Sequence, residues 1–193
     1  VQHTVAQEYF LTADAEGVRP WLERFDRQHK NRYTLATLSP ELNYLCAYWT
    51  DADLLLPSGF PYHNLASNRQ IHAATLDLLS LYQVSPEAWL DFTAPSKFHF
   101  YDRWKVSRVE AAGLSYLYQV FHRAFALDSE SHKKWRAAER QRIAETLAES
   151  GGNKTTQPDL LLVDDVSRAL GQPDLADYEL GIRSGSIEVW VRR

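Results

Sequence analysis

The chain has 193 residues, of which 45% are hydrophobic and 12% aromatic, which is enough for one packed domain and excludes a wholly disordered protein. A formal net charge of −4 excludes a strongly basic protein, and the single cysteine, Cys46, excludes an internal disulfide. No apolar run approaches the roughly 20 residues of a membrane-spanning helix. We therefore expect a cytoplasmic protein without a membrane contact, although a chain that begins at Val1 and has no methionine leaves a removed leader open.

Helix-start signals recur in the first half of the chain. Pro20 favours a short helix that begins there, because proline fits the first turn of a helix. Two Ser-Pro-Glu sequences predict helices over 40–49 and 86–92, since serine caps free backbone N–H groups and glutamate favours the positive end of the helix dipole. Cys46 falls on the apolar stripe of the first of these helices, so we expect it to be buried.

Three further helices are predicted between residues 64 and 149. Prolines and a glycine indicate a loop within 51–63, after which Asn64 caps a helix that ends near residue 82. A long amphipathic helix is predicted over 103–126. The next one, over 130–149, is poor in apolar residues and is expected to be largely exposed.

The last 35 residues change character. Residues 160–163 fit a short strand or the beginning of a helix, and 165–170 fit a short capped helix. The alternation of apolar and polar residues over 186–193 predicts a half-buried strand. Together these elements predict a mainly α fold of the α+β kind. It would have a helical domain over 1–150 and a small C-terminal helix plus β-strand or hairpin element over 151–193, packed on the first.

No sequence motif forces a particular chemistry. None of the seven histidines forms H-E-x-x-H, and residues 151–156 lack the glycines of a phosphate loop. Asp51 and Asp53 resemble a carboxylate pair for a hard cation, although aspartates that follow a helix also form turns. We therefore expect no metal, no cofactor and no catalytic residue that can be named.

Basic residues gather in the middle of the chain. Residues 97–142 hold ten basic and five acidic side chains, whereas 34–96 hold one and six. Such asymmetry indicates a side that faces a polyanion or a charged partner, although solvated helix faces would give the same pattern. Cations near aromatic rings suit phosphates and stacked bases. The predicted nucleic-acid-binding residues are Arg103, Lys105, Arg108, Lys133, Lys134, Trp135, Arg136, Arg140, Arg142 and Arg183.

The C-terminal sequence VDDVSRALG at 163–171, followed by GIRSGSIEVWVRR at 181–193, resembles the winged helix-turn-helix of excisionase and MerR-type proteins. The resemblance covers about thirty residues of the chain. It implies a first helix that ends in the leucine-glycine step, a recognition helix over 174–183, a turn at Gly185 and a β wing over 187–191. It also implies DNA binding in the major groove.

Our leading hypothesis is a non-catalytic accessory or regulatory protein that binds the phosphate backbone of nucleic acid through basic helices. The alternative is a protein-interaction module, an inhibitor or adaptor, whose acidic aromatic surface contains Trp49, Phe60 and Tyr62. A third hypothesis is an enzyme whose dispersed site gathers His63, His72, His99 or Asp51.

Overall fold

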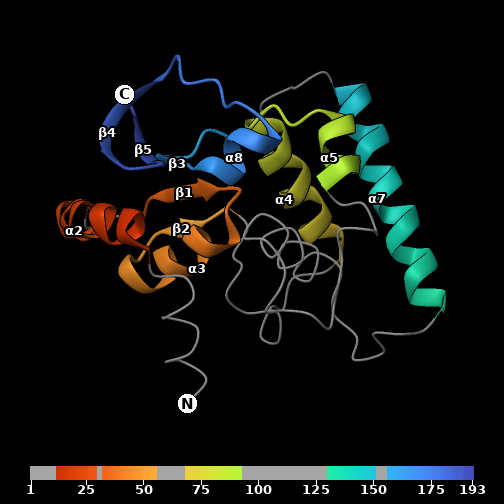
Figure 1. The fold of residues 1–193 in the computed structure, drawn as a ribbon, viewed down its shortest axis with the longest axis horizontal. Helices are drawn as coiled ribbons and strands as arrows, with labels where there is room; N and C mark the ends of the chain where they lie inside the picture. The colour runs from red at the N-terminus through yellow and green to blue at the C-terminus, as the bar shows by residue number, and fades with distance from the viewer. Residues whose placement is uncertain (1–11, 30–31, 56–67, 93–129, 151–155) are drawn as a thin grey trace. The chain divides into compact units, whose positions relative to one another are not determined.

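The computed structural model describes residues 12–29, 32–55, 68–92, 130–150 and 156–193 (Figure 1). Contacts divide the chain into two compact units. Unit 1 comprises residues 1–59, 157–169 and 174–193, and unit 2 comprises 60–156 and 170–173. The C-terminal strands therefore share a unit with the N-terminal segment, which differs from the division at residue 150 that the sequence led us to expect.

Unit 1 contains a five-stranded mixed sheet with the strand order β2-β1-β3-β5-β4. β1 pairs in parallel with β2 and β3, and β5 runs antiparallel to both β3 and β4. The expected mainly α fold with a helical core is therefore wrong. The strands are β1 Thr34–Thr37, β2 Asp53–Leu54, β3 Leu160–Val163, β4 Tyr178–Ser184 and β5 Ile187–Arg192.

Short, fully buried strands explain why the sheet escaped the sequence analysis. All four residues of β3 are buried, so the strand is a continuous apolar run without the alternation that identifies a half-buried strand. β1 also has four residues, and three of them are buried. Residues 160–163, for which the sequence allowed either a strand or the beginning of a helix, form strand β3. The strand predicted over 186–193 is confirmed as β5.

Two helices of unit 1, α2 (Ala13–Gln28) and α3 (Pro40–Trp49), share an apolar core with the sheet, and both lie near β1 and β2 in Figure 1. α2 buries one stripe at helical spacing, formed by Ala15, Val18, Leu22 and Phe25. α3 has the predicted bounds, and Ser39 caps it by accepting a hydrogen bond from the backbone N–H of Leu42 at 3.3 Å.

The structure corrects the predicted start of the first helix. α2 begins at Ala13, where the side chain of Thr12 accepts a hydrogen bond from the N–H of Ala15 at 3.2 Å. Pro20 lies inside the helix and is exposed. Proline at this place removes one backbone hydrogen bond, and the burial of the helix stripe outweighs that loss.

The recognition helix expected over 174–183 is also wrong, because most of this range is strand β4. β4 and β5 form a hairpin whose turn contains Gly185 at φ +54°, a backbone conformation that favours glycine. At the other end of β4 the hydroxyl of Tyr178 donates to the carbonyl of Pro158 at 2.9 Å. The helix α8 (Asp165–Leu170) agrees with the prediction. The family resemblance itself remains a prediction, and it has no recognition helix to support it.

Unit 2 is helical in its described part, with α4 (Asn68–Leu81), α5 (Pro86–Phe92) and α7 (Glu130–Ser150). α7 packs against α4 and α5. The helices predicted over 86–92 and 130–149 are confirmed, and the one that ends near residue 82 is confirmed over its described residues. The helix predicted over 103–126 lies outside the described residues. None of the described helices is long and apolar enough to cross a membrane.

Candidate ligand pocket at the amino ends of two strands

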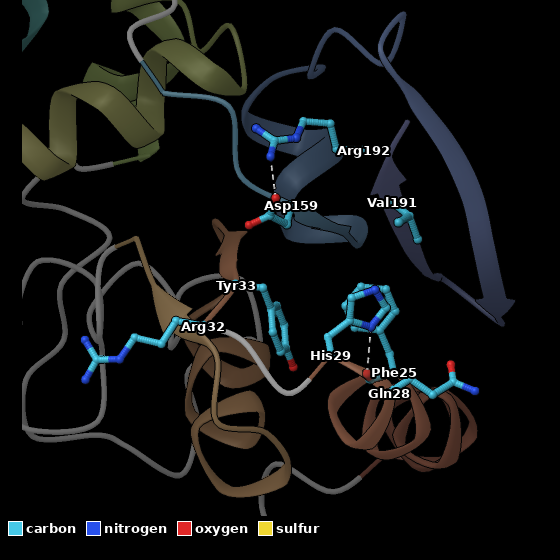
Figure 2. Close-up of a pocket in the computed structure, with 8 residues that line it drawn as sticks. All are labelled: Phe25, Gln28, His29, Arg32, Tyr33, Asp159, Val191 and Arg192. Carbon is cyan, nitrogen blue, oxygen red and sulfur yellow. Dashed lines mark hydrogen bonds and ion pairs between the residues drawn. The ribbon is translucent and has the colours of Figure 1, made fainter.

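A pocket of about 470 Å³ opens in unit 1 beside the amino ends of β1 and β3 (Figure 2). Its walls come from the end of α2 and the link to β1, from the residue before β3, and from the end of β5. Three distant parts of the chain therefore build one site. The lining residues are Phe25, Gln28, His29, Arg32, Tyr33, Asp159, Val191 and Arg192.

His29 stacks on Phe25 at the end of α2. The two ring centroids are 3.7 Å apart and the ring planes differ by 14°. The Nδ1 of His29 also lies 2.9 Å from the carbonyl oxygen of Phe25, one helical turn earlier. The stack and this hydrogen bond hold the imidazole in one orientation, and in Figure 2 its other nitrogen faces the open space of the pocket.

Asp159 is held by groups on both sides of it. Its Oδ2 accepts hydrogen bonds from the N–H and the hydroxyl of Thr34, at 2.8 and 3.0 Å. Its Oδ1 lies 2.5 Å from a guanidinium nitrogen of Arg192. The same guanidinium donates to the carbonyl of Gln157 at 2.7 Å. Both carboxylate oxygens are thus occupied, and Arg192 is fixed at the rim.

Tyr33 lies beside His29 in the lining of the pocket, with the two ring centroids 6.3 Å apart. Its ring meets the ring of Phe25 edge to face at a centroid distance of 5.2 Å. Its hydroxyl donates to the Oδ1 of Asp26 at 2.9 Å. Burial raises the pKa of Tyr33 above its ordinary range, so the phenol remains a protonated donor at neutral pH.

The rim of the pocket carries charges of both signs. The side chain of Arg32 is 87% exposed and lies 4.0 Å from Asp53, and in Figure 2 its guanidinium points away from the other lining residues. Arg24 lies one helical turn before Gln28 on α2, and the described residues give it no ion pair. Two neighbouring carboxylates, Asp26 and Asp159, accept internal hydrogen bonds. Arg192 uses two guanidinium nitrogens toward Asp159 and Gln157 and keeps further N–H donors for an anionic ligand.

The carboxyl ends of β1 and β3 carry polar side chains of a different kind. Ligands commonly bind at this end of parallel strands, and Ser39 and Asp164 are buried there. Both side chains cap helices. Ser39 accepts a hydrogen bond from the N–H of Leu42 at 3.3 Å. The Oδ1 of Asp164 accepts from the N–H and from the hydroxyl of Ser167, both at 2.9 Å. Within the described residues, Ser39 and Asp164 therefore stabilise the ends of helices.

Arg140 and Arg142, the two predicted basic residues of α7 whose side chains are described, do not share one face. Arg140 donates a hydrogen bond to the carbonyl of Leu90, and Arg142 lies with a guanidinium nitrogen 3.3 Å from the Nδ1 of His72. Two positions along a helix place side chains about 200° apart. Four more predicted residues belong to α7, but nothing of their side chains is described, namely Lys133, Lys134, Trp135 and Arg136. Arg103, Lys105 and Arg108 lie outside the described residues.

Arg183, the last predicted nucleic-acid residue, is engaged in an ion pair inside unit 1. Its guanidinium lies 2.5 Å from the Oε1 of Glu188, and Arg168 approaches the same oxygen at 3.2 Å. The other oxygen of Glu188 accepts from the indole N–H of Trp190 at 3.0 Å. Glu188 is buried, so Arg183 serves to neutralise it.

The described residues do not form the acidic aromatic surface or the dispersed enzyme site of the alternative hypotheses. Trp49 packs against the core of unit 1, and the guanidinium of Arg19 lies 5.8 Å from its ring centroid, so it is not part of an open acidic surface. Asp51 donates its backbone N–H to Asp26. Within the described ranges no three His, Cys, Asp or Glu side chains gather as metal ligands. The residues Phe60, Tyr62, His63 and His99 lie outside those ranges.

Sequence reasoning missed the pocket residues. Phe25, His29 and Tyr33 recur every four positions, with arginines at 24, 27 and 32, and this pattern of rings among cations was the available signal. Asp159 and Arg192 carry no such signal, because their meeting depends on the sheet. Comparisons with protein-family models, with curated protein sequences and with solved structures find no match to this chain.

Proposed function

We propose that the protein binds nucleic acid and that the pocket in unit 1 is its contact site. The observation that carries the proposal is that the exposed ring of His29, which is stacked on Phe25, lines one opening together with the guanidinium of Arg192. Arginines neutralise phosphates, and aromatic rings stack on bases. The proposal retains the accessory or regulatory role inferred from the sequence and moves its site from the basic helices to the pocket.

The pocket favours a single strand over a duplex. His29 is the exposed ring of this recess, since Phe25 and Tyr33 are buried, and a base has to leave its stack to reach such a ring. A volume of about 470 Å³ lies within the range of roughly 300–1,000 Å³ that is usual for small-ligand pockets. One nucleotide of a flexible strand is the ligand that this space suits, with the neighbouring phosphates at the rim.

The test is binding of a fluorescently labelled single-stranded oligonucleotide over a series of salt concentrations, for the wild-type protein, Arg32→Ala and Arg19→Ala. Arg32 lies at the rim, whereas Arg19 belongs to the same unit but pairs with Glu23 at 2.8 Å. Each variant removes one positive charge. We expect Arg32→Ala to weaken binding about 3- to 10-fold and to reduce the salt dependence by about one counterion, with Arg19→Ala close to wild type. Equal effects of the two variants, or no binding at low salt, would refute the proposal.

A second candidate site is helix α7, because its residues 133–142 hold five basic side chains and one acidic one. The triple variant of Lys133, Lys134 and Arg136 to alanine tests it in the same assay. A loss of affinity in the triple variant, with Arg32→Ala unaffected, would assign the nucleic acid to α7.

The proposal places the protein in the cytoplasm. Cys46 supports this location, because it is the one cysteine of the chain and is fully buried as a free thiol. Proteins that hold free thiols without disulfides fit a reducing compartment.

A further inference from the structure

We infer that His29 accepts a hydrogen bond from the sugar or base of the bound nucleotide, while Arg192 holds its phosphate. This inference rests on the proposed function and adds to it an orientation of the ligand in the pocket. In this orientation the Nε2 of His29 selects for a ligand that donates a hydrogen bond to it.

The contact between His29 and Phe25 decides which nitrogen carries the proton. A carbonyl oxygen only accepts hydrogen bonds, so the Nδ1 of His29, 2.9 Å from the carbonyl of Phe25, must be the donor. In the neutral ring the Nε2 then has a free lone pair and is an acceptor. Figure 2 shows this nitrogen on the side of the ring that faces the pocket.

A phosphate is a poor partner for this nitrogen. Phosphate oxygens are acceptors at neutral pH, so a lone pair on Nε2 faces them without a proton between them. The guanidinium of Arg192 uses donors toward Asp159 and Gln157, but a guanidinium has five N–H groups, so others remain for a ligand. Arg192 therefore attracts the phosphate, and a hydroxyl or N–H of the nucleotide remains for His29.

The test compares two small competitors of the labelled strand, a nucleoside 5′-monophosphate and inorganic phosphate, at pH 8 and constant ionic strength. The variant is His29→Phe, which keeps an aromatic ring next to Phe25 but removes both nitrogens. The control is Leu180→Ala, an exposed residue of β4 in the same unit that does not line the pocket. We expect His29→Phe to weaken the monophosphate about 3- to 10-fold, as for one lost hydrogen bond, and to leave inorganic phosphate unchanged.

Each result has one interpretation. Unchanged binding of the monophosphate to a folded His29→Phe, or equal losses for both competitors, would overturn the role of His29 and leave the proposed function intact. Failure of the wild-type protein to bind the strand and both competitors would instead reject the proposed function.

Discussion

Thr34 and Asp159 are joined by three hydrogen bonds although 125 residues separate them in the chain. The carboxylate of Asp159 accepts from the backbone and the side chain of Thr34, and the Thr34 hydroxyl oxygen accepts from the N–H of Asp159 at 3.1 Å. These contacts connect the beginnings of β1 and β3. Because Asp159 also holds Arg192, the same residue positions the rim of the pocket.

The first prediction concerns Asp159→Asn. The amide keeps the shape of the side chain but cannot accept from Thr34 and Arg192 with the strength of a carboxylate. We expect the free energy of unfolding to fall by about 1.5–3 kcal/mol, as for hydrogen bonds to a charged group. Urea titration followed by circular dichroism measures it. Asp177→Asn is the control, since that exposed carboxylate has one contact, 3.5 Å from Gln157. Equal stability of the two variants would contradict the role of Asp159.

The second prediction compares two leucines of the same sheet. Leu162 is fully buried against the helices of unit 1, whereas Leu180 on β4 is 44% exposed. Leu162→Ala should lower the free energy of unfolding by about 2–5 kcal/mol, through lost burial and the cavity left behind. Leu180→Ala should change it by less than about 1 kcal/mol. Chemical denaturation of both variants measures the difference, and similar values would argue against the described core.

The third prediction concerns the thiol of Cys46. Burial raises the pKa of Cys46 to about 12, so the native thiol stays protonated and inaccessible. We expect no reaction with a disulfide reagent at pH 8 in the native protein and one reacting thiol per chain after unfolding. Cys46→Ala is the blank. Rapid labelling of the native protein at pH 8 would show that Cys46 is not in the core.

The raised pKa of Cys46 also gives stability a dependence on pH. The neutral thiol is favoured in the folded state, and the thiolate in the unfolded state forms from the ordinary value of about 9. Its contribution is therefore complete below pH 9 and is lost as the pH rises toward 12. The free energy of unfolding should fall over this window, and less steeply in Cys46→Ala.

The fourth prediction separates structure from binding at Arg140. Its guanidinium donates to the carbonyl of Leu90, and its own carbonyl accepts from the indole N–H of Trp89 at 3.1 Å. We expect Arg140→Ala to destabilise the protein by about 1–2 kcal/mol and to change oligonucleotide affinity less than Arg32→Ala does. Thermal unfolding and the strand-binding assay measure the two effects. A stable Arg140→Ala variant with a large loss of affinity would restore Arg140 to the nucleic-acid site.

Local signals in the sequence predicted the helices with distinct caps. The Ser-Pro-Glu sequences placed α3 and α5 correctly, because a capping side chain and a proline act within one turn. The burial of Cys46 and the strand β5 were predicted from the spacing of apolar residues, although burial does not alternate along β5, where Glu188 is buried between Ile187 and Val189. Each of these properties depends on neighbours within a few positions.

The sheet and the pocket depend on partners far along the chain. Residues 34–37 and 160–163 become β1 and β3 only because they pair with each other, and nothing in either tetrapeptide names the partner. Residues 178–184 fold back on β5, and this pairing overrides the helix expected there. The pocket forms only when these strands have paired, so no local sequence pattern identifies Asp159 and Arg192 as pocket residues.

The strand order has a consequence for how the protein is made. β5 is the last strand in the sequence, yet it occupies an interior place in the sheet between β3 and β4. A nascent chain on the ribosome therefore carries α2, α3 and β1 for most of its synthesis before their sheet can close. Unit 2 has by then emerged almost entirely, since residues 60–156 precede β3. A ribosome that stalls ahead of Ile187 would release a chain whose N-terminal apolar surfaces have no finished sheet to cover them, and such a chain is a substrate for chaperones and proteases.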